Sequence, residues 1–191
     1  WIIDKGYKLI GVDAAQLELR MLAHYMRNKE YINEIINGDI HTTTQQAAGL
    51  KSRDQAKTFI YALIYGAGDQ KLGNVVGRGK EDGRRLRQHF FNNTPAFKSL
   101  RDKVQRAAKK GYVKGLDGRK ILIRHPHAAL NTLLQGGGAI VMKQALVILN
   151  NELKLQTHDV KFVANIHDEW QLEACENVVD HVGKLAVNSI I

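Results

Sequence analysis

The order of the elements that this sequence predicts restricts its fold more than any single motif does. Residues 9–13 have the pattern of a short buried strand near the start, and residues 161–166 and 170–174 form two more strand-like runs near the end. Between about residues 31 and 110, apolar side chains recur at helical spacing, with interruptions at glycines and at Pro95. Strands from the two ends can pair in one sheet. The sequence therefore predicts an α+β fold, with a small antiparallel sheet and a mostly helical part inserted into it.

Three further features complete this outline. Residues 115–124 read GLDGRKILIR, in which an Asp-Gly pair followed by alternating isoleucines is typical of a β-hairpin. Residues 127–153 have the length and the apolar content of one long helix. Asp13 lies where the first strand gives way to a helix, and residues 167–169 lie at a tight turn between the last two strands.

The composition favours an acidic partner. Of the 191 residues, 28 are Lys or Arg and 19 are Asp or Glu, which gives a formal net charge of +9 and a pI near 9.7. The excess is strongest in residues 101–124, where cations outnumber anions nine to two. Nucleic acid is the first candidate for such a surface, ahead of a membrane, although a solvated helix face explains the run almost as well.

Other classes of protein have less support. No apolar run is long enough to span a bilayer and no signal peptide begins the chain, so we expect a soluble, cytoplasmic protein. A single cysteine, Cys175, excludes an internal disulfide and is expected to be a small buried core residue. The eight histidines lack the spacing of zinc sites. The chain starts at Trp1 rather than at methionine, and we expect it to be a piece of a longer protein.

The segment RDQAKTFIYALIYGAG, residues 53–68, has the most informative local pattern. Four of its side chains stand four residues apart and would form one inclined stripe on a helix, with the apolar residues mainly on the other side: Arg53, Lys57, Tyr61 and Tyr65. By itself this pattern is equally typical of an ordinary amphipathic helix whose cations reach the solvent.

Two acidic residues stand at strand ends. Asp13 closes the first strand and Asp168 lies in the turn between the last two, so both can meet in one sheet. Acidic side chains are poor strand residues and are costly to bury unpaired, so this placement suggests a metal site, although lone acids at turns are common. Mg²⁺ takes one or two protein carboxylates and leaves its other positions to water and phosphates. With a cationic stripe and a basic surface, the pair predicts phosphoryl transfer.

Three motifs, in the right order, resemble those of family A DNA polymerases. They are VDAAQLELR at residues 12–20, the segment at residues 53–68, and IHDE at residues 166–169. DIHTTTQQAAGL, GLDGRK and HAALNTLLQGGGA also match, and DIHT and KTFIYALIYGAG are closer to the replicative enzymes of phages than to bacterial DNA polymerase I. The resemblance covers roughly residues 8–172.

This resemblance implies a right-hand polymerase architecture that is incomplete. The small antiparallel sheet would be the palm, in residues 1–24 and 126–191, with its second part truncated, and the mostly helical subdomain would be the fingers, in residues 25–125. No exonuclease segment and no recognisable thumb are present, so processive synthesis is not expected of this piece. A processivity partner would act on the full-length parent.

The resemblance also implies an activity. A DNA-directed DNA polymerase of this family adds deoxynucleoside monophosphates from dNTPs to the 3′-hydroxyl of a primer on template DNA and releases pyrophosphate. Two Mg²⁺ ions about 4 Å apart would be held by Asp13, Asp168 and the backbone carbonyl of Ala14. Lys57 would join the two aspartates in catalysis. The residues implied to bind the incoming nucleotide are His41, Arg53, Lys57, Tyr61 and Glu18.

Other matching positions are implied to contact DNA. Tyr65 would hold the templating position, Gly66 would let the helix end tightly, and His167 would position the primer terminus. Glu169 is implied to lie behind the metal ligands or to contact the primer end rather than to be an obligatory ligand. Asn131 and Gln135, one helical turn apart, would face the minor groove of the duplex, where acceptors are present on every base pair.

Two alternatives stay open. In the first, the chain is a basic nucleic-acid-binding module without catalysis, and Asp13 and Asp168 are structural turn residues. In the second, His167 and Asp168 form an HD-type phosphohydrolase dyad. The second alternative needs further His and Asp ligands on helices, whereas the segments that flank the dyad are strand-like.

Overall fold

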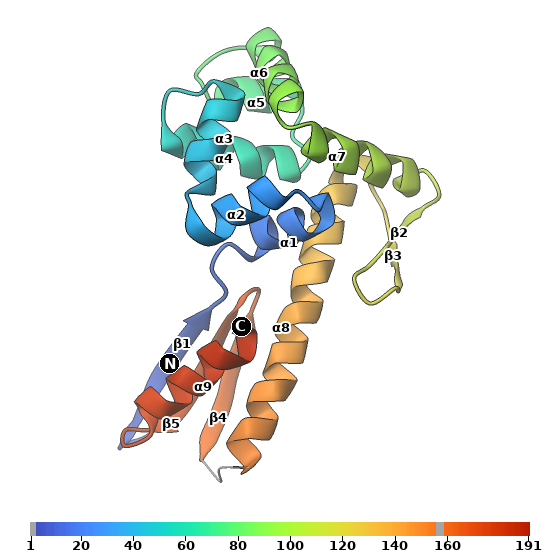
Figure 1. The fold of residues 1–191 in the computed structure, drawn as a ribbon. Coiled ribbons are helices and arrows are strands. Elements are labelled where there is room, and N and C mark those ends of the chain that lie inside the picture. The colour runs from blue at the N-terminus through green and yellow to red at the C-terminus, as the bar shows by residue number, and fades with distance from the viewer. Residues whose placement is uncertain (1–2, 156–158) are drawn as a thin grey trace. The chain divides into compact units, whose positions relative to one another are not determined.

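The computed structural model describes residues 3–155 and 159–191, so Trp1, with which the sequence starts, lies outside the described residues. The chain divides into two compact units (Figure 1). The sheet unit contains both ends of the chain, Trp1–Leu17 and Gly137–Ile191, and the helical unit contains the intervening Glu18–Gly136. The subdomain boundaries that the resemblance implies, near residues 25 and 125, lie inside the helical unit and stay a prediction.

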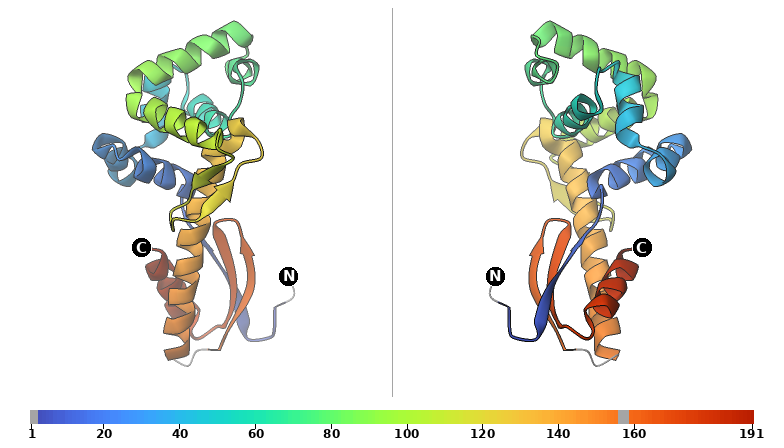
Figure 2. Two further views of the ribbon diagram at one scale, coloured as in Figure 1. Left: turned by 90° about the vertical axis from the view of Figure 1, so that its right-hand side faces the viewer. Right: turned by 90° about the vertical axis from the view of Figure 1, so that its left-hand side faces the viewer.

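The sheet unit contains a three-stranded antiparallel sheet with the order β1-β5-β4. Its strands are β1 (Tyr7–Asp13), β4 (Val160–Ile166) and β5 (Glu169–Cys175). Since β5 lies between the other two, the first strand of the chain pairs with the last one, with Asp13 opposite Glu169. The sheet-unit part of α8 (Ala129–Leu155) and α9 (Val179–Ile190) lie on the same face of this sheet (Figure 2).

The core of the sheet unit lies between the sheet and these two helices. The side chains of Trp170, Leu172 and Ala174 alternate along β5, as the two-residue period of a strand requires, and are fully buried. They pack in one cluster with residues of α8 and α9, namely Met142, Ala145, Leu149, Leu153, Val182 and Ala186. This packing fixes the position of β5, and with it the turn that precedes β5.

The helical unit contains seven helices and one hairpin within the described residues. The helices are α1 (Leu17–Met26), α2 (Lys29–Asn37), α3 (Ile40–Ala48), α4 (Arg53–Ile64), α5 (Asp69–Asn74), α6 (Lys80–Asn93) and α7 (Pro95–Ala108). The hairpin pairs β2 (Tyr112–Lys114) with β3 (Lys120–Leu122), and a short 3₁₀ helix, Pro126–Ala128, precedes α8. Phe59 of α4 packs edge to face against Phe90 of α6 at 5.5 Å between ring centroids, and Phe90 packs in the same way against Phe97 of α7 at 5.3 Å.

Most of the predicted elements are confirmed. The fold is α+β with a small antiparallel sheet, and the hairpin, the tight turn and the helix start at Pro95 are present. Two burial predictions are wrong. Cys175 is half-buried rather than buried, and β1 is only partly buried, with Val12 its one buried residue and Leu9 and Ile10 half-buried. The apolar sequence of β1 does not show which face of an edge strand a helix will cover, so it could not predict how much of this strand is buried.

No segment was predicted to be long and apolar enough to cross a membrane. This prediction is wrong for one helix, as judged by length and composition alone. That helix, Pro126–Lys154, has 29 residues and is apolar enough to pass this test. Glycines and single polar residues interrupt its apolar run in the sequence, whereas a helix distributes them over its faces. Helices of this kind also form the cores of soluble proteins, and Met142, Ala145 and Leu149 are buried against the sheet.

Candidate active site

The acidic residues predicted to bind metal come together at one end of the three-stranded sheet. Asp13 is the last residue of β1, and the amide N–H of Ala14 donates to the backbone carbonyl of Asp168 at 3.0 Å. Asp168 lies in the two-residue turn between β4 and β5, and Glu169 begins β5 opposite Asp13. Backbone pairing therefore brings the carboxylates of two distant segments to the same edge.

The turn itself has an unusual backbone. His167 adopts φ +55°, a left-handed conformation that a residue with a side chain adopts at a cost. A positive φ at the first central residue suits a two-residue hairpin, because it matches the right-handed twist of the strands. Asp168 therefore occupies the second central position of the turn. The imidazole of His167 is exposed beside it.

The carboxylates at this edge repel one another. The pKa of Asp13 is raised by partial burial first, and then by the negative charges of Asp168 and Glu169. A cation at this edge would offset the repulsion. The site thus has the electrostatic character of one that a metal ion stabilises.

One neighbour of these acids was missed by the sequence analysis. The side-chain amide of Gln171 donates to Oε1 of Glu169, two residues back on the same face of β5. Both side chains lie over Gly11 of β1, where an added Cβ would come within 3.1 Å of each of them. The absent side chain of Gly11 therefore leaves the space in which Gln171 holds the Glu169 carboxylate. The signal was a polar residue in an otherwise buried strand, WQLEA.

The donor set fits a hard cation that brings its own waters and phosphates. Among residues 3–155 and 159–191, no three Asp, Glu, His or Cys side chains converge on one metal position. Mg²⁺ needs fewer, because one or two carboxylates usually hold it and substrate oxygens complete the octahedron. Asp13 and Asp168 supply the carboxylates. The carbonyl of Ala14 accepts from the N–H of Leu17 at 3.2 Å and retains a second lone pair.

The predicted stripe is present on α4 in the helical unit. Ser52 caps the helix by accepting from the N–H of Gln55, and the helix runs from Arg53 to Ile64. Arg53 and Lys57 are exposed and Tyr61 is half-buried. The opposite side of α4 is buried, as the pattern predicted: Ala56, Phe59, Ile60, Leu63 and Ile64.

Asp39, which caps α3, and His41, in the first turn of α3, lie beside this stripe. Asp39 forms an ion pair with Arg53, with 2.6 Å between Oδ2 and Nε and 3.1 Å between Oδ1 and Nη2. His41 is buried, and its ring centroid lies 6.3 Å from that of Tyr61. Burial first, and then the charge of Arg53, lower the pKa of His41, so its imidazole is neutral near pH 7.

The stripe ends in a hydrogen-bonded group that the sequence analysis treated as separate residues. The hydroxyl of Tyr65 donates to both carboxylate oxygens of Glu18, at 2.8 and 3.0 Å. Gln135 of α8 donates to the same carboxylate at 3.2 Å. Burial and the Glu18 carboxylate raise the pKa of Tyr65 to about 12, so its proton is retained. Glu18 is thereby fixed from two sides.

Asn131 does not join this group. Its side-chain oxygen is buried and has no hydrogen-bond partner in the part of the chain that the structure describes. The two residues expected to face DNA together therefore differ. Gln135 bonds to Glu18, and Asn131 keeps an acceptor without a donor.

Gly66 follows the stripe at a point where the backbone approaches another segment closely. It adopts φ +77°, and an added Cβ would lie 2.1 Å from the carbonyl oxygen of His127. Both the conformation and the contact require glycine. The tight end of the helix, expected from the sequence, thus brings α4 against the residues that precede α8.

We expect Gly66→Ala to lower the free energy of unfolding of the helical unit by about 3 kcal/mol, because left-handed strain and overpacking add. Gly77→Ala is the matched control, because Gly77 has φ +68° and nothing within 4 Å of the added Cβ. Gly77→Ala introduces the left-handed strain without the overpacking, and it should lower the free energy of unfolding by about 1 kcal/mol. Urea unfolding followed by circular dichroism measures both, and equal losses would contradict the close approach.

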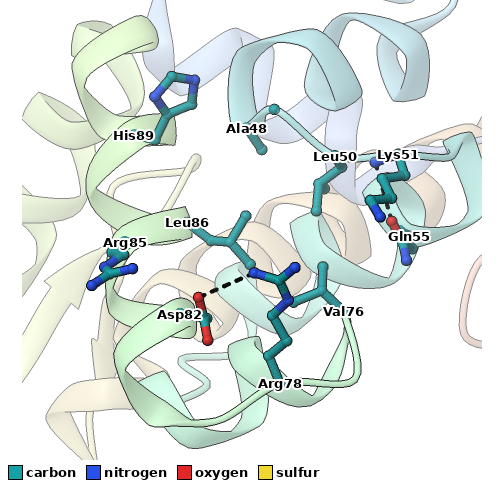
Figure 3. Close-up of a pocket in the computed structure, with 11 residues that line it drawn as sticks. Ala48, Leu50, Lys51, Gln55, Val76, Arg78, Asp82, Arg85, Leu86 and His89 are labelled. Carbon is teal, nitrogen blue, oxygen red and sulfur yellow. Dashed lines mark hydrogen bonds and ion pairs between the residues drawn. The ribbon is translucent and has the colours of Figure 1, made fainter.

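The helical unit also contains a cavity that none of the predicted site residues lines. It has a volume of about 620 Å³ and lies among α3, α4 and α6 (Figure 3). Leu50 and Leu86 face it from opposite walls, and Arg78 reaches Asp82 at 3.5 Å. The polar groups of this cavity are thus partly paired with one another.

The structure therefore places the candidate residues in two sets. Asp13, Ala14, His167, Asp168 and Glu169 belong to the sheet unit, where they share one edge. The other set belongs to the helical unit and lies along α4 and at the start of α8: Glu18, His41, Arg53, Lys57, Tyr61, Tyr65, Gly66, Asn131 and Gln135.

Comparison with known proteins gives consistent matches. A model of DNA polymerase family A matches residues 1–190. The DNA-directed DNA polymerase of Enterobacteria phage T3 is 46% identical over 200 residues, which cover 91% of this chain and 28% of that protein. The enzyme of the same name from Escherichia phage T7 is 46% identical over 197 residues, with 90% and 28% covered.

More distant relatives agree. DNA polymerase I of Aquifex aeolicus is 30% identical over 205 residues, which cover 98% of this chain and 36% of that protein. Among solved structures, the POL domain of Pol1 from M. smegmatis, in complex with DNA primer-template and dNTP, superposes with a TM-score of 0.88 at 22% identity. That match covers 100% of this chain and 38% of the other, and it shows the fold. The chain spans about three tenths of the phage relatives.

Proposed function

This chain belongs to DNA polymerase family A, and we propose that it is the catalytic core of a template-directed DNA polymerase. The reaction adds deoxynucleoside monophosphates to the 3′-hydroxyl of a primer and releases pyrophosphate. The observation that carries the proposal is the acidic edge of the sheet, where Asp13 and Asp168 meet and the pKa of Asp13 is raised by partial burial and by its acidic neighbours. An edge of this kind needs a cation, and phosphoryl transfer uses one.

The comparisons support the choice of reaction. Relatives that are 46% identical are named DNA-directed DNA polymerases, and the similar solved structure is a complex with DNA primer-template and dNTP. The likeness to the phage enzymes exceeds that to the DNA polymerases I, at 26–30% identity. Primer-template DNA and dNTPs are accordingly the proposed partners, and a processivity partner would belong to the full-length parent.

In the sheet unit, Asp13 and Asp168 would hold two Mg²⁺ ions, with the carbonyl of Ala14 as a third ligand. When bound, such ions lower the pKa of a hydroxyl and offset the charge of a leaving pyrophosphate. The protein supplies the geometry, because backbone pairing would bring the two residues together before substrate arrives. Glu169 would stay outside the ligand set, held by Gln171. The exposed His167 would contact the primer end.

In the helical unit, α4 would bind the incoming nucleotide. Arg53 and Lys57 would bind its triphosphate, and Lys57 would offset charge on the reacting phosphates. His41, neutral at pH 7, would add one hydrogen-bond donor rather than a charge. Tyr61, one turn further, would lie beside the sugar and base, since each turn of the helix advances 5.4 Å.

The hydrogen-bonded group at the end of α4 would select the sugar and hold the template. Glu18, fixed by Tyr65 and Gln135, would close the space beside C2′ of the nucleotide. Tyr65 and Gly66 would hold the templating position. Asn131 would donate from its side-chain amide to acceptors in the minor groove, because its side-chain oxygen is buried. Under this proposal residues 1–24 and 126–191 belong to the palm and residues 25–125 to the fingers, and the protein acts in the cytoplasm, in a bacterial host if it is phage-encoded.

The test is primer extension by this chain, or by its parent, with Mg²⁺ and dNTPs on a primed template. We expect template-directed addition that chelation of the metal abolishes. Binding to DNA without any extension by the parent would leave a basic nucleic-acid-binding module as the correct function.

Sugar selection gives a sharper prediction. Glu18→Ala should admit ribonucleotides, because it removes the volume beside C2′, whereas a helix-dipole role would cost only a little stability. Glu30→Ala is the control, because Glu30 is also an acidic residue in the first turn of a helix of the same unit but has no proposed role, so it should retain sugar selectivity. Competition between ATP and dATP on one template measures the ratio, and an unchanged ratio in Glu18→Ala would contradict the assignment.

A further inference from the structure

Arg53 is held by the carboxylate of Asp39. Oδ1 of Asp39 accepts from Nη2 of Arg53 at 3.1 Å, and Oδ2 accepts from Nε at 2.6 Å. A two-point pair of this kind fixes both the position and the plane of the guanidinium. Arg53 is the first residue of α4, and Asp39 precedes α3, so the contact joins the starts of two helices.

Asp39 has more partners than a helix cap needs. It caps α3 by accepting from the N–H of His41 at 3.2 Å, and it accepts from the hydroxyl of Thr42 at 2.7 Å. Capping needs a single side-chain oxygen, and asparagine or serine would serve as well. The charge and the second oxygen are used by Arg53. The cap and Thr42 in turn immobilise the carboxylate that holds the arginine.

The pair is charged over the whole range of working pH. Hydrogen bonds from Arg53 first, and then from Thr42, lower the pKa of Asp39 well below its usual value, and Asp39 raises the pKa of Arg53. Both side chains remain accessible, with 51% of the Arg53 side chain and 36% of the Asp39 side chain exposed. The contact therefore adds little stability, since exposed ion pairs seldom do. Its effect is on orientation.

We propose that Asp39 is a positioning residue that orients Arg53 for the triphosphate of the incoming nucleotide. The inference rests on the proposed function. Asp39 occupies the Nε and Nη2 side of the guanidinium and leaves the N–H groups of Nη1 for phosphate oxygens. An arginine that is already ordered loses less side-chain freedom when the nucleotide binds. Asp39 would thus favour binding without touching the nucleotide.

The direction in which loss of Asp39 changes nucleotide affinity distinguishes orientation of Arg53 from competition with the phosphates. If Asp39 orients Arg53, its loss weakens nucleotide binding. If Asp39 competes with phosphate for the same donors, its loss strengthens binding, because the guanidinium is released and a negative charge is removed. We expect orientation to prevail, since the two acceptors use different edges of the guanidinium and the charge of Asp39 is already paired.

The experiment is a double-mutant cycle on nucleotide affinity. Asp39→Asn keeps the cap on α3 and removes the charge, Arg53→Ala removes the oriented group, and the double variant combines the two changes. Asp82→Asn is the matched control, because Asp82 is 34% exposed, pairs with Arg78 at 3.5 Å in the same unit, and also adds one unit of net charge when neutralised. Calorimetric titration with dTTP and Mg²⁺ gives Kd for each, and thermal unfolding shows that each variant folds.

We expect Asp39→Asn to raise Kd about fivefold, which corresponds to about 1 kcal/mol. Asp82→Asn should leave Kd unchanged. In the Arg53→Ala background, which itself binds more weakly, Asp39→Asn should have no further effect, because a positioning residue acts only through the group that it positions. A purely structural role of Asp39 would instead give the same loss in both backgrounds.

The outcomes that overturn the inference are distinct from those that overturn the proposed function. If Arg53→Ala weakens binding but Asp39→Asn leaves Kd unchanged, lowers it, or acts equally in the Arg53→Ala background, Asp39 does not position Arg53. If the unmodified chain does not bind the nucleotide at millimolar concentration, or if Arg53→Ala binds it unchanged, the proposed function of α4 is wrong and this inference is wrong with it.

Discussion

Replacement of Asp13 or of Asp168 by alanine is expected to remove nearly all nucleotide addition while DNA binding is retained. Each carboxylate would supply one of the few protein ligands to the ions, and loss of about 4 kcal/mol of transition-state stabilisation slows a reaction about a thousandfold. DNA binding depends mainly on phosphate contacts with the basic surface, so it should persist. Primer extension and a DNA-binding titration on the same preparations, each compared with a chain that extends a primer, measure the two effects.

Asp4→Ala is the matched control for these two variants. Asp4 belongs to the same unit and pairs with Lys161 at 2.5 Å, away from the acidic edge, so its loss should leave extension unchanged. Extension retained by both alanine variants would remove the metal assignment.

Asp13→Asn adds a test of the electrostatics. Because the pKa of Asp13 is raised in the folded state, its ionised form opposes folding, and neutralisation should stabilise the metal-free protein at pH 7.

The second large effect is expected at Tyr61, in the choice between normal nucleotides and chain terminators. If Tyr61 lies beside the sugar, its hydroxyl supplies a polar group where a missing 3′-hydroxyl would leave a phosphate oxygen unpaired, and such a gap is costly in a closed site. The unmodified protein should then use dideoxynucleotides almost as well as deoxynucleotides. Tyr61→Phe removes one oxygen and little volume, so terminators should become strongly disfavoured while the fold is kept.

The measurement is the ratio of incorporation efficiencies for ddTTP and dTTP. Tyr25→Phe serves as the control, because Tyr25 belongs to the same unit and its buried hydroxyl has no hydrogen-bond partner among the described residues. Its loss should not change the ratio. The same ratio in Tyr61→Phe as in the unmodified protein would show that Tyr61 is not at the sugar, and the placement of the nucleotide along α4 would have to be abandoned.

The elements of this protein were predictable where periodicity is strong. The period of α4 separated Phe59, Ile60 and Leu63 from the exposed stripe, and strand ends located Asp13 and Asp168. Contacts between distant segments were not predictable. Nothing in the sequence pairs Asp39 with Arg53 or Glu18 with Tyr65, because such contacts depend on how helices pack rather than on the pattern within each helix. The partial exposure of β1 was missed for the same reason.

The pairing of β1 with β5 has a consequence for the order of folding. Residues 7–13 bond with residues 169–175, and the whole helical unit lies between them in sequence. Closing so long a loop is slow and entropically costly, whereas the helical unit is continuous and can form from nearer contacts. During synthesis, Asp13 emerges long before Asp168 exists. We therefore expect the helical unit to become protected from hydrogen exchange first, and any capacity to retain a divalent ion to appear last, once β5 has entered the sheet.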